Sequence, residues 1–328
     1  MKTFLWLVKR EFWEHRGGFL WAPIVTAGVF LALNLMGIIT GEVLRSRHHA
    51  SFNGIDFDQI SRHMDDKTLA VVSNVLDTTM FSPSMLVFLV MSVVVFFYCV
   101  NTLAEDRRDR SILFWKSLPL SDRSMVLSKV ASAIVVAPVI ATVVSVVAGV
   151  VMLLMLAIVG SVHGAHVWNL VWTLPHPFRV IGTMLGTLPL YLVWTLPAVG
   201  WLLLCSAWSR SKPFLWALAL PLGAGTIVSW FKLMGLFDLS SGWFWLHIVG
   251  RSLLSVVPGG WIAGQIHAGD MHGMDRVGMD ISPHAFVDIL GMQNDYALLL
   301  TPPFWIGAIA GIVMIAGATW LRRWRTEM

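Results

Sequence analysis

The sequence predicts an all-α membrane protein that crosses the bilayer six times and keeps both termini in the cytosol. Of its 328 residues, 56% are hydrophobic and only 13% are charged, whereas soluble domains carry about 25% charged residues. Six apolar stretches reach the length of about 20 residues that a membrane-spanning helix needs. If the N-terminus lies inside, 15 of the 23 lysines and arginines fall in the cytosolic segments, and this bias sets the orientation.

Residues 1–18 are predicted to form a helix that lies in the membrane interface. Apolar side chains recur at helical spacing at Phe4, Val8 and Phe12, with Trp13 beside them, and such a stripe dips into lipid. The charged residues are expected between or opposite these positions: Lys9, Arg10, Glu11, Glu14 and His15. The helix ends at Gly17-Gly18. The 22 residues of 19–40 exceed a signal-peptide core of about 7–15 residues, so they are interpreted as an uncleaved first span.

The chain is predicted to form a single transmembrane domain over residues 1–328, with no soluble domain attached. Its six spans cover about residues 19–40, 84–104, 130–160, 181–208, 214–235 and 303–321. Because proline removes a helical hydrogen bond, we expect Pro138 to kink the third span, and Pro189 and Pro197 to bend the fourth. Neighbouring helices can satisfy the backbone groups that proline leaves free.

Two long segments are predicted on the outer side, at 41–83 and 236–302. The first is polar and charged, and a short amphipathic helix is predicted around Leu69 to Met80. Within the second, 243–266 is apolar but contains Arg251, Pro258 and several glycines. A seventh span there would place the C-terminal arginines outside, against the positive-inside rule. We therefore interpret 243–266 as an interfacial or re-entrant helical segment on the outer face.

Short motifs of nucleotide hydrolysis and of common hydrolases are missing. The sequence has no Gly-Lys-Ser/Thr phosphate-binding loop, no Gly-x-Ser-x-Gly elbow and no His-Glu-x-x-His zinc motif. The predicted spans also contain almost no ionisable residue, whereas ion-driven carriers place carboxylates or histidines there. The sequence therefore favours a non-catalytic pathway for an apolar or amphiphilic substrate that is driven from outside the membrane domain. Nothing in it points to nucleic acid binding.

Two other functions stay open at this point. The outer stretch 265–286 is rich in histidine, methionine and aspartate, and His267, Met271 and His272 could hold a transition metal in a metal-related permease. No tight ligand spacing recurs there, so an ordinary solvent-facing loop is the plainer interpretation. The second alternative is a membrane-embedded enzyme or assembly factor that works without an ATPase.

The most basic stretch of the chain is 105–129, which lies between the second and third predicted spans. Six of its 25 residues are basic: Arg107, Arg108, Arg110, Lys116, Arg123 and Lys129. Aromatic Phe114 and Trp115 lie among these charges, and a Ser-Leu-Pro-Leu-Ser break follows at 117–121. This pattern predicts a short amphipathic helix, a turn and the start of a second helix. We expect a soluble partner to bind this stretch and to transmit its own movement to the membrane helices through it. The plainer alternative is a basic loop that only fixes the topology.

In its order of elements the chain resembles the membrane subunits of ABC-2 type ATP-binding-cassette transporters. The resemblance covers the whole length and rests on LVKREFWEHRG at 7–17, on six spans with both ends inside, and on the first cytosolic loop. Glu105 is similar to the glutamate that opens this loop in the family, and Pro119 and Ser121 to its turn. The family often has a glycine after the glutamate, where this chain has Asp109-Arg110-Ser111.

This resemblance implies partners and roles. Such subunits are multi-pass proteins of the bacterial cytoplasmic membrane, which pair as homodimers or with a second permease subunit. They dock on cytosolic ATPases that bind ATP and Mg, and they bind no cofactor themselves. Phe114 and Trp115 would anchor the loop helix in a groove of the ATPase. Four basic residues would pair with acidic groups or lipid head groups: Arg107, Arg108, Arg110 and Lys116. Ser121 would cap the next helix. Export is the expected direction.

Overall fold

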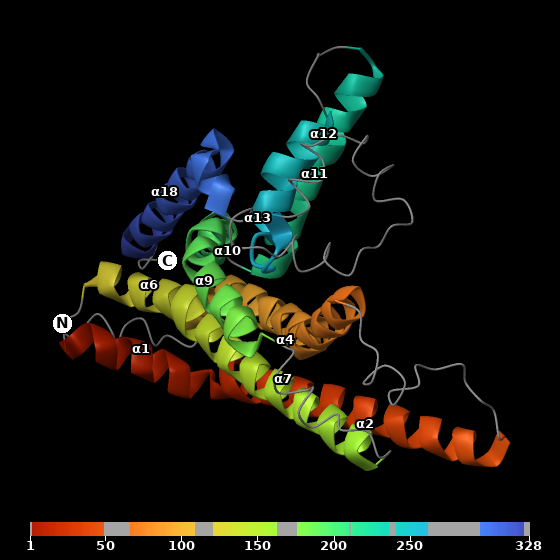
Figure 1. Ribbon diagram of the computed structural model, residues 1–328. Coiled ribbons are helices and arrows are strands. Elements are labelled where there is room, and N and C mark those ends of the chain that lie inside the picture. Colours follow the sequence, from red (N-terminus) through yellow and green to blue (C-terminus); the bar gives the residue numbers. More distant parts are fainter. Residues whose placement is uncertain are drawn as a thin grey trace.

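The computed structural model describes residues 2–48, 66–108, 121–162, 176–209, 211–235, 241–261 and 296–324. Within these ranges the regular secondary structure is helical throughout, so the all-α prediction is confirmed. Five of the described helices are long and apolar enough to cross a membrane, and the number rises to six if one bent pair counts as a single span. Figure 1 shows the helices coloured along the chain.

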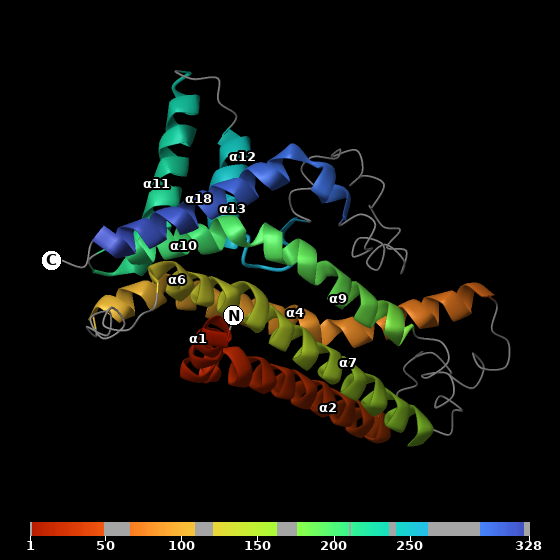
Figure 2. The same ribbon diagram turned by 90° about the vertical axis from the view of Figure 1, so that its left-hand side faces the viewer.

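The first three long helices, α2, α4 and α7, pack side by side (Figures 1 and 2). The elements in order are α1 (Lys2–Glu14), the π-helical turn η1 (Gly17–Trp21), α2 (Ala22–His48), α4 (Asp66–Arg108), α6 (Asp122–Ala131), the π-helical turn η2 (Ser132–Val136) and α7 (Ala137–Val162). Small buried residues such as Cys99, Ala137 and Ala141 lie in the core, where they let helix backbones approach closely. The π-helical turn η2 falls directly before Pro138, the residue expected to kink this span, and the helix then continues to Val162.

The helix α4 corrects the predicted boundary between the outer segment 41–83 and the second span. It runs without a break from Asp66 through Pro83 to Arg108, so the separate amphipathic helix around Leu69 to Met80 is wrong. Pro83 cannot donate to the carbonyl of Thr79, four residues earlier. The Ser82 hydroxyl donates to that carbonyl instead, at 2.8 Å. The helix therefore passes through the proline with its carbonyl satisfied.

The fourth span is bent, as the prolines predict. The helices α9 (Pro177–Trp194) and α10 (Leu196–Trp208) meet at an angle of 46°. The break lies at Thr195, two residues before Pro197, whereas Pro189 lies inside α9 without ending it. This bend lets α10 turn away from α9 toward the C-terminal helices (Figure 2).

The C-terminal half contains two further apolar helices and a short helical insertion. Its elements are α11 (Pro213–Leu233), α12 (Ser241–Phe244), the π-helical turn η3 (Trp245–Gly250), α13 (Arg251–Leu254), the 3-10 turn η4 (Leu298–Leu300) and α18 (Pro302–Trp324). We call residues 241–261 the inserted segment. Its continuous helical part, residues 241–254, is shorter than the about 20 residues that a span needs. Its last residues, including Val256 and Trp261, are buried in the molecule.

Helices α10 and α18 cross at two glycines. A Cβ atom added at Gly311 would lie 2.4 Å from the carbonyl carbon of Leu196, and one added at Gly200 would lie 2.5 Å from the carbonyl oxygen of Gly311. Only glycine fits at both positions, because any side chain would meet backbone. This small-residue contact holds the bent span against the last helix.

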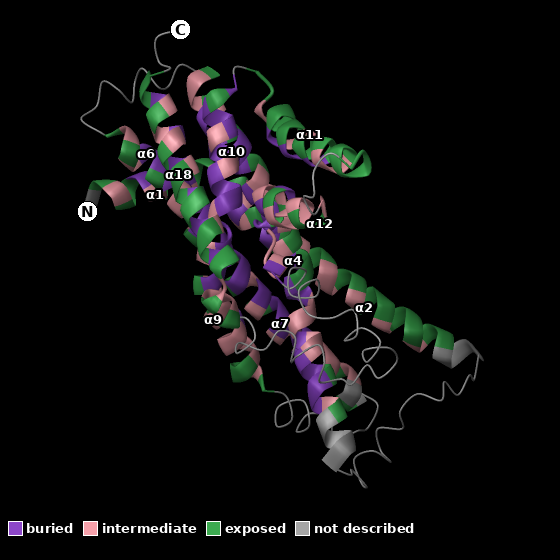
Figure 3. Cartoon of the chain, turned by 90° about the horizontal axis from the view of Figure 1, so that it is seen from above, coloured by how far each residue is buried: buried purple, intermediate pink, exposed green. Residues whose placement is uncertain are grey.

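Two of the long helices leave most of their surface uncovered in a single chain. Only 11% of the apolar window of the span that includes α2 is buried, and 17% of that of α11. Figure 3 shows both helices mainly in the colour of exposed residues, whereas α10 is mostly buried. Apolar side chains on these faces suit contact with lipid or with another membrane helix.

Candidate functional site

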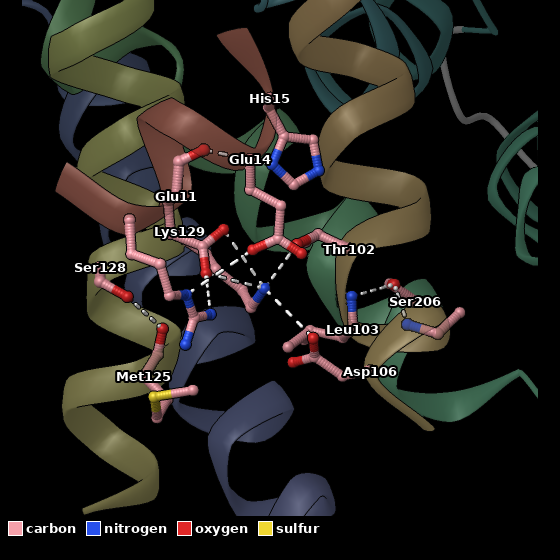
Figure 4. Close-up of polar contacts among 12 residues, drawn as sticks. Glu11, Glu14, His15, Thr102, Leu103, Asp106, Met125, Ser128, Lys129 and Ser206 are labelled. Carbon is pink, nitrogen blue, oxygen red and sulfur yellow. Dashed lines mark hydrogen bonds and ion pairs between the residues drawn. The ribbon is translucent and has the colours of Figure 1, made fainter. Parts of the chain in front are cut away.

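A buried ion network joins four helix ends that lie far apart in the sequence. It consists of Glu11 on α1, Tyr98, Thr102 and Asp106 on α4, Lys129 on α6 and Arg322 on α18. Most of its members appear in Figure 4, where the side chains converge between the helices. Removing charges from water costs free energy, so a buried cluster of this kind is stable only if each charge has an opposite charge beside it.

The centre of the network is the ion pair between Glu11 and Lys129. The Lys129 ammonium lies 3.2 Å from Oε1 of Glu11 and donates a hydrogen bond of 2.8 Å to Thr102 Oγ1. The Tyr98 hydroxyl donates to Oε2 of Glu11 at 2.9 Å. Glu11 is 0% exposed and Lys129 is 2% exposed. Each charge thus has an opposite charge and a neutral hydrogen-bond partner, which is what a buried pair requires.

Asp106 extends the network to the C-terminal helix. Its Oδ1 atom lies 3.5 Å from the Lys129 ammonium, and its Oδ2 atom accepts a hydrogen bond of 2.8 Å from Arg322. Arg322 also lies 3.5 Å from Asp122, at the first turn of α6. The end of α4, the start of α6 and the end of α18 are therefore held together by alternating charges.

Glu11, Glu14 and His15 could also be considered as metal ligands, since their ligand atoms lie within 4.8 Å of one another. Glu11, however, already pairs with Lys129 and accepts a hydrogen bond of 2.7 Å from Arg10. A metal ion bound there would face two positive charges at short range. The donor set therefore favours ion pairing over metal binding.

A second contact ties the end of α4 to the end of α10. The Ser206 hydroxyl accepts hydrogen bonds from the backbone N–H groups of Leu103 and Ala104, at 3.2 and 3.1 Å. Arg107 donates to the carbonyls of Ser206, Ala207 and Ser209. A cation that binds the free carbonyls at a helix C-terminus is favourable, both by hydrogen bonding and by the helix dipole.

The structure describes only part of the predicted coupling set. Glu105 and Arg108 lie exposed at the end of α4, and Arg107 binds α10 within the same chain. Five members of the set lie outside the described residues: Arg110, Phe114, Trp115, Lys116 and Pro119. Contact of this set with a partner stays a prediction. The alternative metal ligands His267, Met271 and His272 also lie outside the described residues.

Ser121 caps α6, as its position before Asp122 predicts. Its side-chain oxygen accepts a hydrogen bond of 3.2 Å from the backbone N–H of Ser124, and Asp122 lies in the first turn of the helix. Both groups compensate the unpaired N–H groups and the positive end of the helix dipole. The helix that carries Lys129 therefore begins at a fixed residue.

Replacing Ser121 by alanine is expected to lower the free energy of unfolding by about 1 kcal/mol, because the N–H of Ser124 loses its acceptor. Ser121→Asn supplies another capping oxygen and is expected to keep the stability of the natural protein. Thermal unfolding of the purified protein in detergent measures both. Equal midpoints for the alanine and asparagine variants would contradict the capping role.

The helix α1 has a different buried face from the one predicted. Phe4, Val8 and Phe12 are half-buried, and Trp13 is exposed. Glu11, which was expected between or opposite the apolar residues, is on the buried face with Leu7. This expectation is wrong because Lys129 and Tyr98 provide a polar lining for that face. Placement of α1 in a membrane interface stays a prediction.

Most of the buried ion network has no signal in the sequence, but Glu11 has one. Glu11 follows Phe4 by seven residues and Leu7 by four, so helical geometry places all three on one face. A carboxylate on an apolar helix face needs a cationic partner if that face is buried. No comparable spacing identifies which of the many basic residues supplies the partner charge.

Comparison with known proteins gives one match, to a protein-family model. Residues 68–174 match the family model described as ABC-2 family transporter protein. This match supports an ABC-2 type membrane permease subunit. No curated protein and no solved structure matches the chain.

The matched part of the chain contains the central members of the network, namely Tyr98, Thr102, Asp106 and Lys129. Their partners Glu11 and Arg322 come from outside it. ABC-2 permeases are multi-pass membrane proteins that are typically non-catalytic and work with a cytosolic ABC ATPase. The network thus connects the two ends of the chain to the segment that carries the family resemblance.

Proposed function

We propose that this permease exports an amphiphilic or hydrophobic substrate across the bacterial cytoplasmic membrane, using energy from a separate ATPase that binds ATP and Mg. The observation that carries the proposal is the buried ion network. We call residues 109–116, the part of the loop that is expected to contact the ATPase, the docking segment. The network fastens α1, α4, α6 and α18 together on both sides of it. A push on that segment would therefore move four helix ends as one unit.

The orientation we propose places this end of the molecule in the cytosol. Both α1 and α18 pack against α6, and Arg322 near the end of α18 lies 3.5 Å from Asp122. The same end is rich in basic residues, among them Arg10, Arg107, Arg108, Arg123 and Arg322. Lysines and arginines are enriched on the cytosolic side of membrane proteins, so the charge distribution supports an inward-facing docking end. An ATPase could reach it from there.

Movement of the docking segment would be transmitted to the spans through two fixed connections. Ser121 and Asp122 hold the first turn of α6, and Lys129 on that helix is paired with Glu11 on α1. Arg107 and Ser206 tie the other flank of the docking segment to α10. Pushing the segment would thereby act on the third span through α6 and on the bent fourth span through α10. We propose that two permease subunits, identical or different, move in this way around the substrate.

The proposal predicts that replacing Phe114 and Trp115 by alanine together uncouples the permease from its ATPase. Buried aromatic anchors carry much of the binding energy at protein interfaces. We expect the variant to insert into the membrane and fold normally but to lose ATPase co-purification and the permease-dependent stimulation of ATP hydrolysis. Both are measured on the co-expressed pair.

Phe178→Ala provides the matched control, because Phe178 is an aromatic residue that is 88% exposed on α9. That variant is expected to retain co-purification and stimulation. Full co-purification and full stimulation in the Phe114/Trp115 double variant would place the ATPase contact elsewhere and overturn the proposed coupling.

A further inference from the structure

The inserted segment is held firmly inside the helical bundle. Its Val256 carbonyl accepts hydrogen bonds from Tyr191 on α9, at 2.7 Å, and from Ser92 in the middle of α4, at 3.1 Å. Its Ser255 carbonyl accepts from Thr195, at the bend between α9 and α10, at 3.1 Å. The inserted segment thus reaches the bend of the fourth span. Helix α13, which lies earlier in the same segment, packs on α10 (Figure 1).

This arrangement buries a cation that lacks a counter-charge. Arg251, the first residue of α13, is only 8% exposed. One guanidinium nitrogen, Nη1, donates to the carbonyl of Pro303 at 2.7 Å, and the group lies 4.1 Å from the centre of the Trp194 ring. The Nε and Nη2 atoms have no hydrogen-bond partner. Within the described parts of the chain, no carboxylate forms an ion pair with Arg251.

A third unpaired donor lies in the same place. Trp194 is 9% exposed, and its indole Nε1 is buried without a partner. The guanidinium and the indole therefore offer three unsatisfied N–H donors beside each other. A buried donor without an acceptor costs about 1–3 kcal/mol, and more if it is charged. Guanidinium stays charged at any physiological pH, so the cost cannot be avoided by losing a proton.

The described residues around Arg251 leave room for its guanidinium, but none of them places a carboxylate beside it. A Cβ atom added at Gly307 would lie 2.6 Å from Arg251 Cζ, so the guanidinium occupies the space that this glycine leaves open. Trp194 also packs in a cluster of buried apolar and aromatic residues that includes Leu190, Trp261 and Phe304. The described residues supply no acceptor for these donors. An anionic group of a ligand could supply it, and the cluster would contact that ligand's apolar part.

We propose that Arg251 and Trp194 form a binding site for the anionic group of an amphiphilic ligand, such as the phosphate of an acidic phospholipid. An anionic oxygen group can accept from several donors at once, and arginine matches phosphate and carboxylate in a bidentate fork. A freely soluble anion would lose its hydration and gain no apolar contact. The site is closed in this structure, so the ligand enters when α18 separates from the inserted segment. This inference concerns ligand binding by the chain alone, and it holds whether or not the proposed ATPase coupling is correct.

The test is the thermal stabilisation of the purified full chain in a neutral detergent by added phosphatidylglycerol. Phosphatidylcholine serves as the control for a zwitterionic lipid. Inorganic phosphate serves as the control for a freely soluble anion. We expect phosphatidylglycerol to raise the unfolding midpoint of the natural protein and the other two to raise it little. In Arg251→Gln the concentration needed for half of the effect is expected to rise at least about tenfold, because charge-assisted hydrogen bonds are lost. Trp194→Phe keeps the ring, loses one donor and is expected to weaken binding less.

Two further variants keep the test decisive. Arg179→Gln removes an exposed arginine on α9 and is expected to bind phosphatidylglycerol like the natural protein. If Arg251→Gln does not fold, Gly307→Ala displaces the guanidinium by steric contact and is expected to weaken binding in the same way. Unchanged phosphatidylglycerol binding in the Arg251 or Gly307 variants would overturn the site. An equal response to phosphatidylcholine or to inorganic phosphate would overturn the anionic amphiphile as its ligand.

Discussion

Replacing Lys129 by methionine is expected to lower the free energy of unfolding by about 3–5 kcal/mol, the cost of breaking a buried ion pair from one side. Methionine fills a similar volume but removes the ammonium that lies 3.2 Å from Glu11 and 3.5 Å from Asp106. Glu11 is fully buried and keeps only the partly exposed Arg10 as a counter-charge. Thermal or denaturant unfolding of the purified protein in detergent measures the loss.

Two comparison variants separate charge pairing from packing. Glu11→Gln combined with Lys129→Met removes both charges, so it is expected to recover much of the lost stability. Arg123→Met removes an exposed cation from the same helix and is expected to change the stability by less than about 0.5 kcal/mol. If Lys129→Met were as stable as Arg123→Met, the network would have no structural role.

Replacing Gly311 by alanine is expected to have the second large effect, by forcing α10 and α18 apart. The new methyl group would lie 2.4 Å from backbone of Leu196, and backbone cannot turn aside as a flexible side chain can. Overpacking a close contact costs about 1–3 kcal/mol, and occasionally more. We expect a lower unfolding midpoint and a smaller yield of monodisperse protein on size-exclusion chromatography.

Gly317→Ala is the matched control on the same helix. Its Cβ would lie 3.4 Å from Leu204 Cδ1, which is ordinary van der Waals contact with a side chain. Alanine also favours helix over glycine, so this variant is expected to be as stable as the natural protein or slightly more stable. A Gly311→Ala protein that behaves like Gly317→Ala would contradict the close crossing of α10 and α18.

The spans could be predicted from the sequence because their signals are local. A run of apolar residues defines a spanning helix wherever its neighbours lie, and Pro197 bends a helix through its own ring. The cap at Ser121 is local too, since the serine binds an N–H only three residues away. Such features need no knowledge of the tertiary structure.

Features that depend on distant partners could not be predicted in this way. The spacing of Glu11 places it on an apolar helix face, yet nothing local shows that its partner is Lys129, more than a hundred residues later. Arg251 argued against a seventh span, but its burial beside Trp194 became visible only when the fold brought them together.

The unbroken course of α4 has a mechanical consequence. Its 43 residues make a rod of about 65 Å at 1.5 Å per residue, roughly twice the hydrocarbon thickness of about 30 Å. A rod that is longer than the bilayer is thick acts as a lever. Asp106, through Arg322, and Arg107, through the carbonyls at the end of α10, hold one arm, and the packed middle around Val87 would serve as the fulcrum. A small displacement of the Asp106 end of α4 would then move the other end of the helix, on the far side of Pro83, in the opposite direction, without any change in the helix itself.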